Sequence, residues 1–198
     1  MRTIVTQVDP RSDDDIITIS NRLDFTRNSL VDDGTLWILA TDTDEPQGFP
    51  WRLAFELRNR GWWLRQDIVS SVPRWGIHHY YFMLANNAQY YYDQTAIKET
   101  ANTKTTDKTK IKFGGNKYGD NPEYIIHSGK IWQPTGFRNK RSVWSVAADT
   151  IVEEFAQVAE FAILAGSEQG DTITDPFATW QITESVATKL NRNFRREK

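Results

Sequence analysis

Residues 171–189 read Asp-Thr-Ile-Thr-Asp-Pro-Phe-Ala-Thr-Trp-Gln-Ile-Thr-Glu-Ser-Val-Ala-Thr-Lys, and this stretch decides how the chain folds. The β-branched run Thr172–Thr174 predicts a short strand, which ends at Asp175-Pro176-Phe177. A helix is predicted next, because apolar residues recur every four positions at Ile182, Val186 and Leu190. A strand, a tight turn and a helix in this order are typical of the place where an α/β sheet binds a nucleotide-type cofactor.

Strand and helix patterns alternate along most of the remaining chain. Apolar or alternating runs predict strands at Thr3–Val8, Ile16–Ile19, Leu36–Leu39, Gln66–Ser70, His79–Leu84, Gln89–Tyr92 and Val143–Val146. Helical spacing predicts helices at Pro50–Arg58, before Gly61, and at Ala148–Ala165, before Gly166. The segment Arg22–Val31 is compatible with a helix or with irregular structure. The turn Ala85–Ala88 is expected to join the strands on either side as a hairpin.

The composition limits what this chain can do. Its 198 residues carry a net charge of −2, so a nucleic-acid surface would have to be a local patch. The absence of cysteine excludes disulfides, thiolate nucleophiles and Cys-based zinc sites, and the three histidines predict no metal site. The sequence shows no signal-like start and no apolar run of the roughly 20 residues that a membrane span needs. We therefore expect a cytoplasmic protein that binds neither a metal nor a membrane.

One segment differs in composition from the rest. At about residues 98–122, lysines lie among Thr, Asn and Gly with almost no apolar residues; they are Lys98, Lys104, Lys108, Lys110, Lys112 and Lys117. This composition predicts a flexible, Lys-rich insertion. No repeat or linker argues for a second domain, so residues 1–198 are expected to form a single domain.

Several stretches resemble the amino-group DNA methyltransferases, which make N4-methylcytosine or N6-methyladenine. The turn Asp175-Pro176-Phe177 is similar to their cofactor-binding motif. Other segments resemble the permuted class of this family, in which the catalytic motif precedes the cofactor motif: Asp32–Ile38, Trp51–Leu57, Gly61–Ile68, Tyr90–Ile97, Gly136–Trp144 and Ile163–Ser167. The resemblance implies a three-layer α/β/α Rossmann-like methyltransferase fold, with a mainly parallel sheet and an antiparallel strand near Tyr80–Leu84.

The cofactor motif departs from the family pattern. In the family, Asp-Pro-Phe is followed by a Gly-x-Gly turn, where glycine lets the backbone approach S-adenosylmethionine closely. Here no glycine follows, and an indole at Trp180 is expected to fill the space that the cofactor occupies in the family. No cofactor is therefore expected at this degenerate motif, which consists of Asp175, Pro176, Phe177, Ala178, Thr179 and Trp180.

The catalytic motif also looks altered. Family members carry Ser/Asp-Pro-Pro-Tyr after a strand that is assigned here to Ile16–Ile19, and the residues that follow are Ser20, Asn21, Arg22 and Leu23. Ser20 could still accept a hydrogen bond from a target amine. The prolines that fix the backbone and the aromatic ring that stacks on a flipped base are gone, and Arg22 places a cation where a methylsulfonium would approach. No catalytic residues are therefore expected.

Two further departures affect the cofactor site that the resemblance implies. The aromatic residue that the family places against the adenine is missing near Ile151. The fold is expected to be truncated after the cofactor-motif helix, so that no strand brings an acidic residue to the ribose; the tail ends in Arg195, Arg196, Glu197 and Lys198. The strand Thr172–Thr174 would then lie near an exposed sheet edge, which favours a homodimer or docking onto a partner methyltransferase.

Basic residues are the candidates for contact with nucleic acid. Arg138, Asn139, Lys140 and Arg141 lie next to Trp144, a combination that suits phosphate and base-edge contacts, although a turn with solvated charges is the alternative. Lys108, Lys110 and Lys112 lie in the region that the family uses for target recognition, and a solvated loop is again the alternative. The adjacent His78 and His79 are interpreted as structural.

Three functions remain open after these comparisons of motifs. The preferred one is a catalytically inactive DNA methyltransferase-like protein that binds nucleic acid or regulates or partners a methyltransferase. The second is a protein-interaction or decoy module that binds no nucleic acid. The third is an active amino DNA methyltransferase with an atypical site, which would require S-adenosylmethionine.

Overall fold

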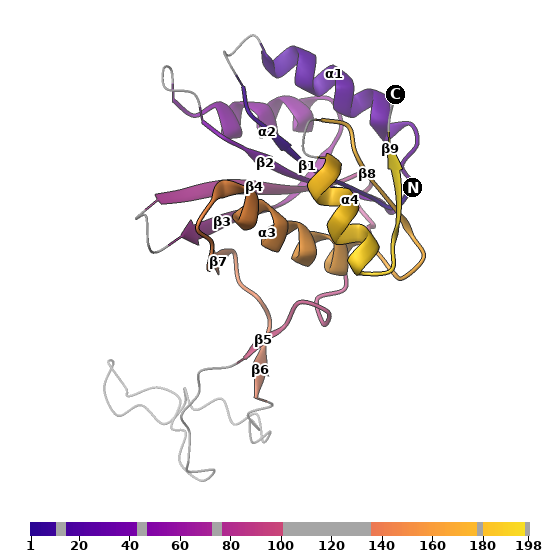
Figure 1. Ribbon diagram of the computed structural model, residues 1–198. Coiled ribbons are helices and arrows are strands. Elements are labelled where there is room, and N and C mark those ends of the chain that lie inside the picture. Colours follow the sequence, from indigo (N-terminus) through magenta and orange to yellow (C-terminus); the bar gives the residue numbers. More distant parts are fainter. Residues whose placement is uncertain (11–14, 43–46, 73–76, 101–135, 178–179, 197–198) are drawn as a thin grey trace, which may run out of the picture. The chain divides into compact units, whose positions relative to one another are not determined.

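The computed structural model describes residues 1–10, 15–42, 47–72, 77–100, 136–177 and 180–196 (Figure 1). The chain divides into two compact units, one formed by Met1–Ile97 with Lys140–Lys198 and the other by Lys98–Asn139. The described part of the second unit is an antiparallel pair of strands, β5 (Glu99–Thr100) and β6 (Phe137–Arg138). The second unit begins at Lys98, where the Lys-rich insertion is predicted, but residues 101–135 lie outside the described ranges.

A seven-stranded sheet runs through the first unit in the order β7-β3-β4-β2-β1-β8-β9. Its strands are β1 (Thr3–Val8), β2 (Thr35–Ala40), β3 (Trp63–Val72), β4 (Ile77–Ala85), β7 (Val143–Ser145), β8 (Thr172–Asp175) and β9 (Asn193–Arg196). β4 is antiparallel to both β2 and β3, and the other neighbours are parallel. The predicted antiparallel strand near Tyr80–Leu84 is therefore confirmed.

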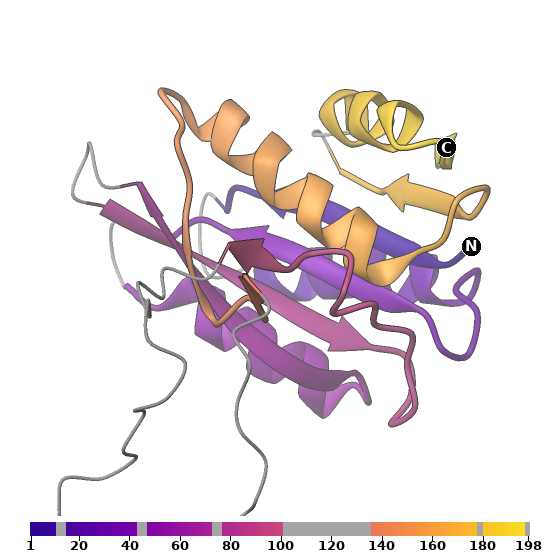
Figure 2. The same ribbon diagram turned by 90° about the horizontal axis from the view of Figure 1, so that it is seen from below.

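Helices cover both faces of this sheet. Figure 2 shows α3 (Ile151–Gly166) and α4 (Trp180–Lys189) on one side, and α1 (Asp15–Arg27) and α2 (Phe49–Asn59) on the other. Each face has its own hydrophobic cluster: side chains of α3 and α4 pack with Val5 and Trp37, and side chains of α1 and α2 pack with Ile4 and Leu36. Neighbouring residues of β1 thus point to opposite clusters, as the two-residue period of a strand requires. The predicted three-layer α/β/α fold is confirmed.

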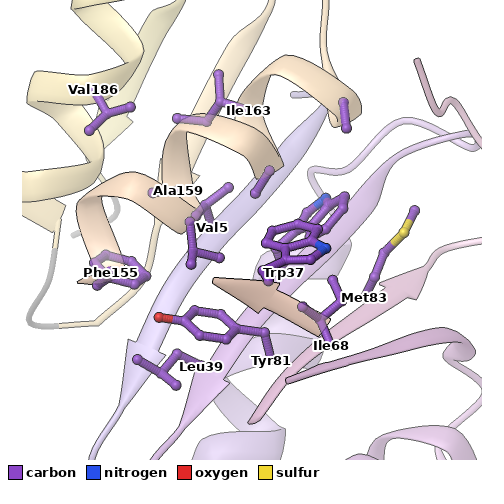
Figure 3. Packing of buried hydrophobic residues seen from close by; sticks show 14 of the residues in the cluster. Val5, Trp37, Leu39, Ile68, Tyr81, Met83, Phe155, Ala159, Ile163 and Val186 are labelled. Atoms are coloured by element: carbon purple, nitrogen blue, oxygen red, sulfur yellow. The ribbon is translucent and has the colours of Figure 1, made fainter. Parts of the chain in front are cut away.

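The core beneath α3 is rich in aromatic rings (Figure 3). Trp37 lies at its centre, with its ring stacked on Tyr92 at 6.3 Å between centroids and tilted against Trp144 at 6.4 Å. At the end of α3, a Cβ on Gly166 would lie only 2.9 Å from the hydroxyl oxygens of Thr3 and Thr35. Glycine is needed there because the helix backbone touches the sheet, and Thr3 donates a 2.6 Å hydrogen bond to the Gly166 carbonyl.

Two predicted strands are wrong. Ile16–Ile19 lies within α1, whose buried residues Ile19, Ser20, Leu23 and Thr26 follow a helical period, so burial along one helix face outweighed the β-branched run. Gln89–Tyr92 is irregular, because its backbone bonds go elsewhere: the Tyr91 N–H donates to the Asp33 carbonyl at 2.9 Å. The hairpin partner of β4 is β3, and not the segment after Ala85–Ala88.

The expected truncation after α4 is also wrong. Asn193–Arg196 forms β9, which pairs in parallel with all four residues of β8. The polar sequence of the tail is tolerated because β9 is the last strand of the sheet, where Phe194 packs on the core and its neighbours are exposed. β8 is therefore an interior strand, and the expected exposed edge at Thr172–Thr174 does not exist.

Candidate cofactor and nucleic-acid sites

The order of the strands places a topological switch point at the carboxyl ends of β1 and β8. These two parallel strands are neighbours, and the chain leaves them in opposite directions: β1 leads through α1 to β2 on one side, and β8 leads through α4 to β9 on the other. α1 and α4 lie on opposite faces of the sheet. Such a switch point is where open α/β sheets bind their ligands.

At this point Asp175 ends β8 with a buried carboxylate. The side chain is 2% exposed, and Oδ1 accepts hydrogen bonds from the Thr6 hydroxyl and, at 2.9 Å, from the Phe177 backbone N–H. Oδ2 accepts a 3.0 Å bond from the hydroxyl of Thr183. These bonds fasten the turn and α4 to β1. Both oxygens are thus engaged within the protein, in agreement with a structural role for Asp175 in the turn.

The rest of the cofactor motif is described only in part. Pro176 and Phe177 are half-buried, and Phe177 packs on the core under α1 and α2. Ala178 and Thr179 lie outside the described residues, as does the side chain of Trp180, whose backbone begins α4. That the Trp180 indole fills the cofactor space therefore stays a prediction.

The assignment of the catalytic motif to Ser20, Asn21, Arg22 and Leu23 needs correction. These residues lie within α1, and the Ser20 and Leu23 side chains are fully buried, so they do not follow a strand. The strand that borders β8 is β1, and the chain that follows it reads Asp9-Pro10-Arg11-Ser12. Compared with the family pattern Ser/Asp-Pro-Pro-Tyr, the first two positions are kept and the last two are changed.

Asp9 follows β1 at this switch point. Its Oδ1 accepts a 2.6 Å hydrogen bond from the hydroxyl of Thr41, which follows β2, and the Thr41 backbone N–H donates to the Val8 carbonyl at 3.2 Å. The Asp9 side chain is exposed. Sequence reasoning missed this residue, although the predicted end of the first strand at Asp9-Pro10 was a usable signal once β1 was known to lie beside β8.

On the other side of this switch point the described chain stops at the end of β9, and Glu197, the next residue, lies outside the described ranges. Arg196 ends that strand, and its guanidinium donates a 2.8 Å bond to Oε2 of Glu184 on α4. At the start of α3, Ile151 is the first helical residue, and the nearest aromatic ring on the helix, Phe155, is 1% exposed in the core.

The basic candidates are divided between the two units. Arg138 belongs to the second unit and forms a 2.8 Å ion pair with Glu99, and Asn139 is exposed at the end of the same unit. Lys140 and Arg141 begin the return to the first unit. The Lys140 ammonium lies 4.0 Å from the ring centroid of Phe161 and 5.1 Å from that of Trp144, in cation-π contacts that also serve packing.

Arg141 is the better placed cation of the first unit. Its side chain is exposed, and its carbonyl accepts a hydrogen bond from the indole N–H of Trp144. Within the first unit, the structure brings Lys140, Arg141 and Trp144 together. Lys108, Lys110 and Lys112 lie outside the described residues.

Two absences concern the described residues alone. No helix among them is long and apolar enough to cross a bilayer. Within the same residues, His, Asp and Glu side chains form no group of three that could hold a metal ion.

Known proteins that resemble this chain in sequence are DNA methyltransferases. A family model described as DNA methylase matches residues 13–195. The Type II methyltransferase M.SmaI of Serratia marcescens is 28% identical over 213 residues, covering 84% of this chain and 63% of the relative. M.Cfr9I of Citrobacter freundii, also a Type II methyltransferase, is 29% identical over 195 residues, covering 75% and 55%. The chain thus spans only 63% and 55% of the length of these relatives.

Solved structures share the fold at low sequence identity. PvuII DNA methyltransferase, described as cytosine-N4-specific, has a TM-score of 0.68 at 10% identity, covering 99% of this chain and 74% of that one. M1.HpyAVI in its SAM complex has a TM-score of 0.56 at 12% identity, covering 98% and 80%.

Proposed function

Because this chain belongs to the DNA methylase family of N6/N4 amino-group methyltransferases, we propose that it is a member that no longer transfers methyl groups and that acts by binding nucleic acid. The observation that carries the proposal is the connection between β8 and α4, in which no residue is glycine. Each residue there carries a Cβ or a proline ring. The backbone N–H groups are therefore kept from the close approach that a glycine turn gives a bound nucleotide.

Charge at the switch point supports the same proposal. S-adenosylmethionine carries a positive sulfonium and a positive ammonium group, and the family resemblance implies an acidic residue for its ribose. Here the Asp175 carboxylate is engaged by donors of the protein itself. It is therefore less available as a hydrogen-bond acceptor for a cationic cofactor.

Calorimetric titration with S-adenosylmethionine tests the loss of the cofactor. We expect no measurable heat of binding from the natural chain. A variant with Thr179→Gly, Trp180→Ser and Gln181→Gly, which restores the Gly-x-Gly pattern, should gain affinity because it regains backbone approach. Binding by the natural chain in the low micromolar range would overturn the proposal.

One observation favours an active enzyme as the second candidate. Asp9 and Pro10 at the end of β1 keep two positions of the family's catalytic pattern, and Thr41 holds the Asp9 carboxylate at 2.6 Å. An active site there would use Asp9 to accept a hydrogen bond from the target amine. Transfer of a labelled methyl group to duplex DNA, lost in Asp9→Ala, would establish this candidate against the first.

Binding of nucleic acid is tested separately by gel shift. We expect duplex DNA to be shifted at low salt and released as the salt concentration rises, because phosphate contacts release counterions. Replacing Arg141, Lys108, Lys110 and Lys112 by Ala should weaken the shift. Lys189→Ala removes an exposed cation of α4 that is paired with Glu160 and serves as the control. No shift at low salt would favour a role in protein interaction.

A homodimer or a partner methyltransferase was expected because β8 was predicted to have an exposed edge. β9 covers that edge. Among the described strands, the edges of the seven-stranded sheet are β7 and β9, so an interface formed by strand pairing would use one of these two. Size-exclusion chromatography with light scattering measures whether the chain self-associates.

A further inference from the structure

Three buried side-chain oxygens on the α3 side of the sheet have no hydrogen-bond partner among the described residues: Ser70 Oγ, Tyr81 Oη and Glu154 Oε1. Ser70 and Glu154 are 0% exposed, and Tyr81 is 2% exposed. A buried polar atom without a partner costs free energy comparable to a lost hydrogen bond, and a buried carboxylate oxygen costs more. Such atoms are rare, and several on one face of a sheet indicate an occupant that hydrogen-bonds or coordinates to them.

The register of the strands places Ser70 and Tyr81 on one face of the sheet, and Glu154 packs on that face from α3. Ser70 on β3 lies directly opposite His79 on β4, so both side chains point to the same face, and Tyr81 shares that face because it is two residues further along β4. Glu154 approaches this face from α3. Its Oε2 is hydrogen-bonded to Nδ1 of His79 at 2.8 Å. Figure 3 shows the Tyr81 hydroxyl pointing toward Phe155, the residue after Glu154.

The cluster contains one carboxyl group, that of Glu154. Burial, and after it the negative charge of Glu154, raises the pKa of Tyr81 well above its ordinary value, so this phenol stays neutral. Among the described residues, His79 is the one side chain that bonds the Glu154 carboxylate, and it does so at Oε2. The other oxygen, Oε1, has no partner there, and a buried carboxylate oxygen without a partner is costly.

We propose that Ser70, Tyr81 and Glu154 bind a small monovalent cation, either ammonium or an alkali-metal ion. Two hydroxyl oxygens and one carboxylate oxygen are hard ligands that suit such an ion, and they match the several donors of an ammonium group. A cation bonded to Oε1 is attracted by the negative charge of Glu154, whereas a neutral water molecule at the same oxygens is not, so the identity of the salt cation distinguishes the two occupants.

Thermal unfolding of the full chain at neutral pH tests the proposal. The chain is melted in ammonium, potassium, sodium or tetramethylammonium chloride at one ionic strength of about 0.15 M, so that screening is equal and only the size and donors of the cation differ. We expect Tm to be higher by about 3 °C or more in ammonium or potassium than in tetramethylammonium, which is too large for the site. A higher Tm in ammonium than in potassium would indicate that the bound cation donates hydrogen bonds. Equal Tm values in these two salts would indicate that only the charge and size of the cation matter.

Variants locate the effect. Glu154→Gln removes the buried charge and should abolish the difference between the salts. Glu160→Gln removes an exposed carboxylate from the same helix and should keep it. Tyr81→Phe removes one oxygen and no charge, so it should reduce the difference even if Glu154→Gln fails to fold. Equal Tm values of the natural chain in all four salts, or a difference that survives both Glu154→Gln and Tyr81→Phe, would overturn the proposal. This outcome is independent of cofactor and DNA binding.

Discussion

At the scale of single residues, Asp175 joins three elements through one carboxylate. Thr6 of β1, Thr183 of α4 and the backbone of Phe177 all donate to it, and the Thr183 hydroxyl also lies 3.3 Å from the Val5 carbonyl. Hydrogen bonds to a buried charge are stronger than neutral ones, and water cannot replace a lost donor in a packed interior. The position of α4 on the sheet therefore depends on Thr183.

Thr183→Val tests this dependence, because it keeps the shape of the side chain and removes its donor. We expect the free energy of unfolding, measured by denaturant titration, to fall by about 1–3 kcal/mol. Thr188→Val makes the same change at an exposed position of α4 and should cost less than about 0.5 kcal/mol. Equal effects of the two substitutions would show that the carboxylate does not need Thr183.

Tyr81 predicts a loss of stability in alkaline solution. Its pKa is raised well above 10.0 in the folded chain, first by burial and then by Glu154, whereas the unfolded chain ionises near the ordinary value. The stability from neutral Tyr81 is complete below that value and is lost as the pH rises toward the folded pKa, because only the unfolded state then releases its proton. Tm should therefore fall from about pH 9 to about pH 11, and less steeply in Tyr81→Phe.

The controls for this pH dependence are within the same chain. Tyr91 and Tyr92 also have pKa values raised mainly by burial, and both remain in Tyr81→Phe, so they cancel when the two proteins are compared. Parallel curves for the two proteins would contradict the role assigned to Tyr81.

Sequence reasoning reached some of these residues and missed others for a physical reason. Asp175 could be placed at a strand end because its neighbours Pro176 and Phe177 carry local turn signals. The partner of Glu154 could not be predicted from the sequence, because His79 lies 75 positions away and contacts Glu154 only when α3 packs on β4. Side-chain pairs across elements follow from register and helix packing, which a single sequence does not encode locally.

At the scale of elements, a helix or strand could be predicted from the sequence when its apolar pattern extends over enough residues. The helices α2, α3 and α4 have long apolar periods and were predicted, whereas α1 was read as a strand over Ile16–Ile19 because four residues give too short a period. β9 was missed because a polar edge strand gains its stability from the β8 ladder rather than from its own side chains. The catalytic motif was assigned to Ser20–Leu23, within α1, because Ile16–Ile19 was predicted to be a strand.

The start of α3 carries a prediction at this scale. Thr150 caps the helix by accepting a 3.1 Å bond from the Glu153 N–H, while the Glu153 carboxylate accepts a 2.7 Å bond from the Asp149 N–H. Because the Thr150 hydroxyl satisfies a backbone donor of the first turn, Thr150→Ala should lower the free energy of unfolding by about 0.5–2 kcal/mol. Thr150→Ser keeps the oxygen and should stay within about 0.5 kcal/mol of the natural chain in the same denaturant titration.

At the scale of the whole molecule, the first unit contains every part of the three-layer fold. All seven strands of the main sheet and the helices on both its faces come from Met1–Ile97 and Lys140–Lys198. The second unit, Lys98–Asn139, contributes only β5 and β6 among the described residues, and these pair with each other. The switch point at β1 and β8 and the candidate loop lysines therefore belong to different units, so that folding and nucleic-acid binding can be separated by experiment.

Replacing residues 98–139 by a flexible Gly/Ser linker of about ten residues tests this separation. We expect the shortened chain to keep the circular dichroism and cooperative melting of the natural one, because no strand of the main sheet is removed. Its gel shift with duplex DNA should be lost if Lys108, Lys110 and Lys112 supply the phosphate contacts, and retained if Lys140 and Arg141 suffice. Loss of cooperative melting would instead show that Lys98–Asn139 is needed to close the core around Ile97 and Trp144, which are both buried in the first unit.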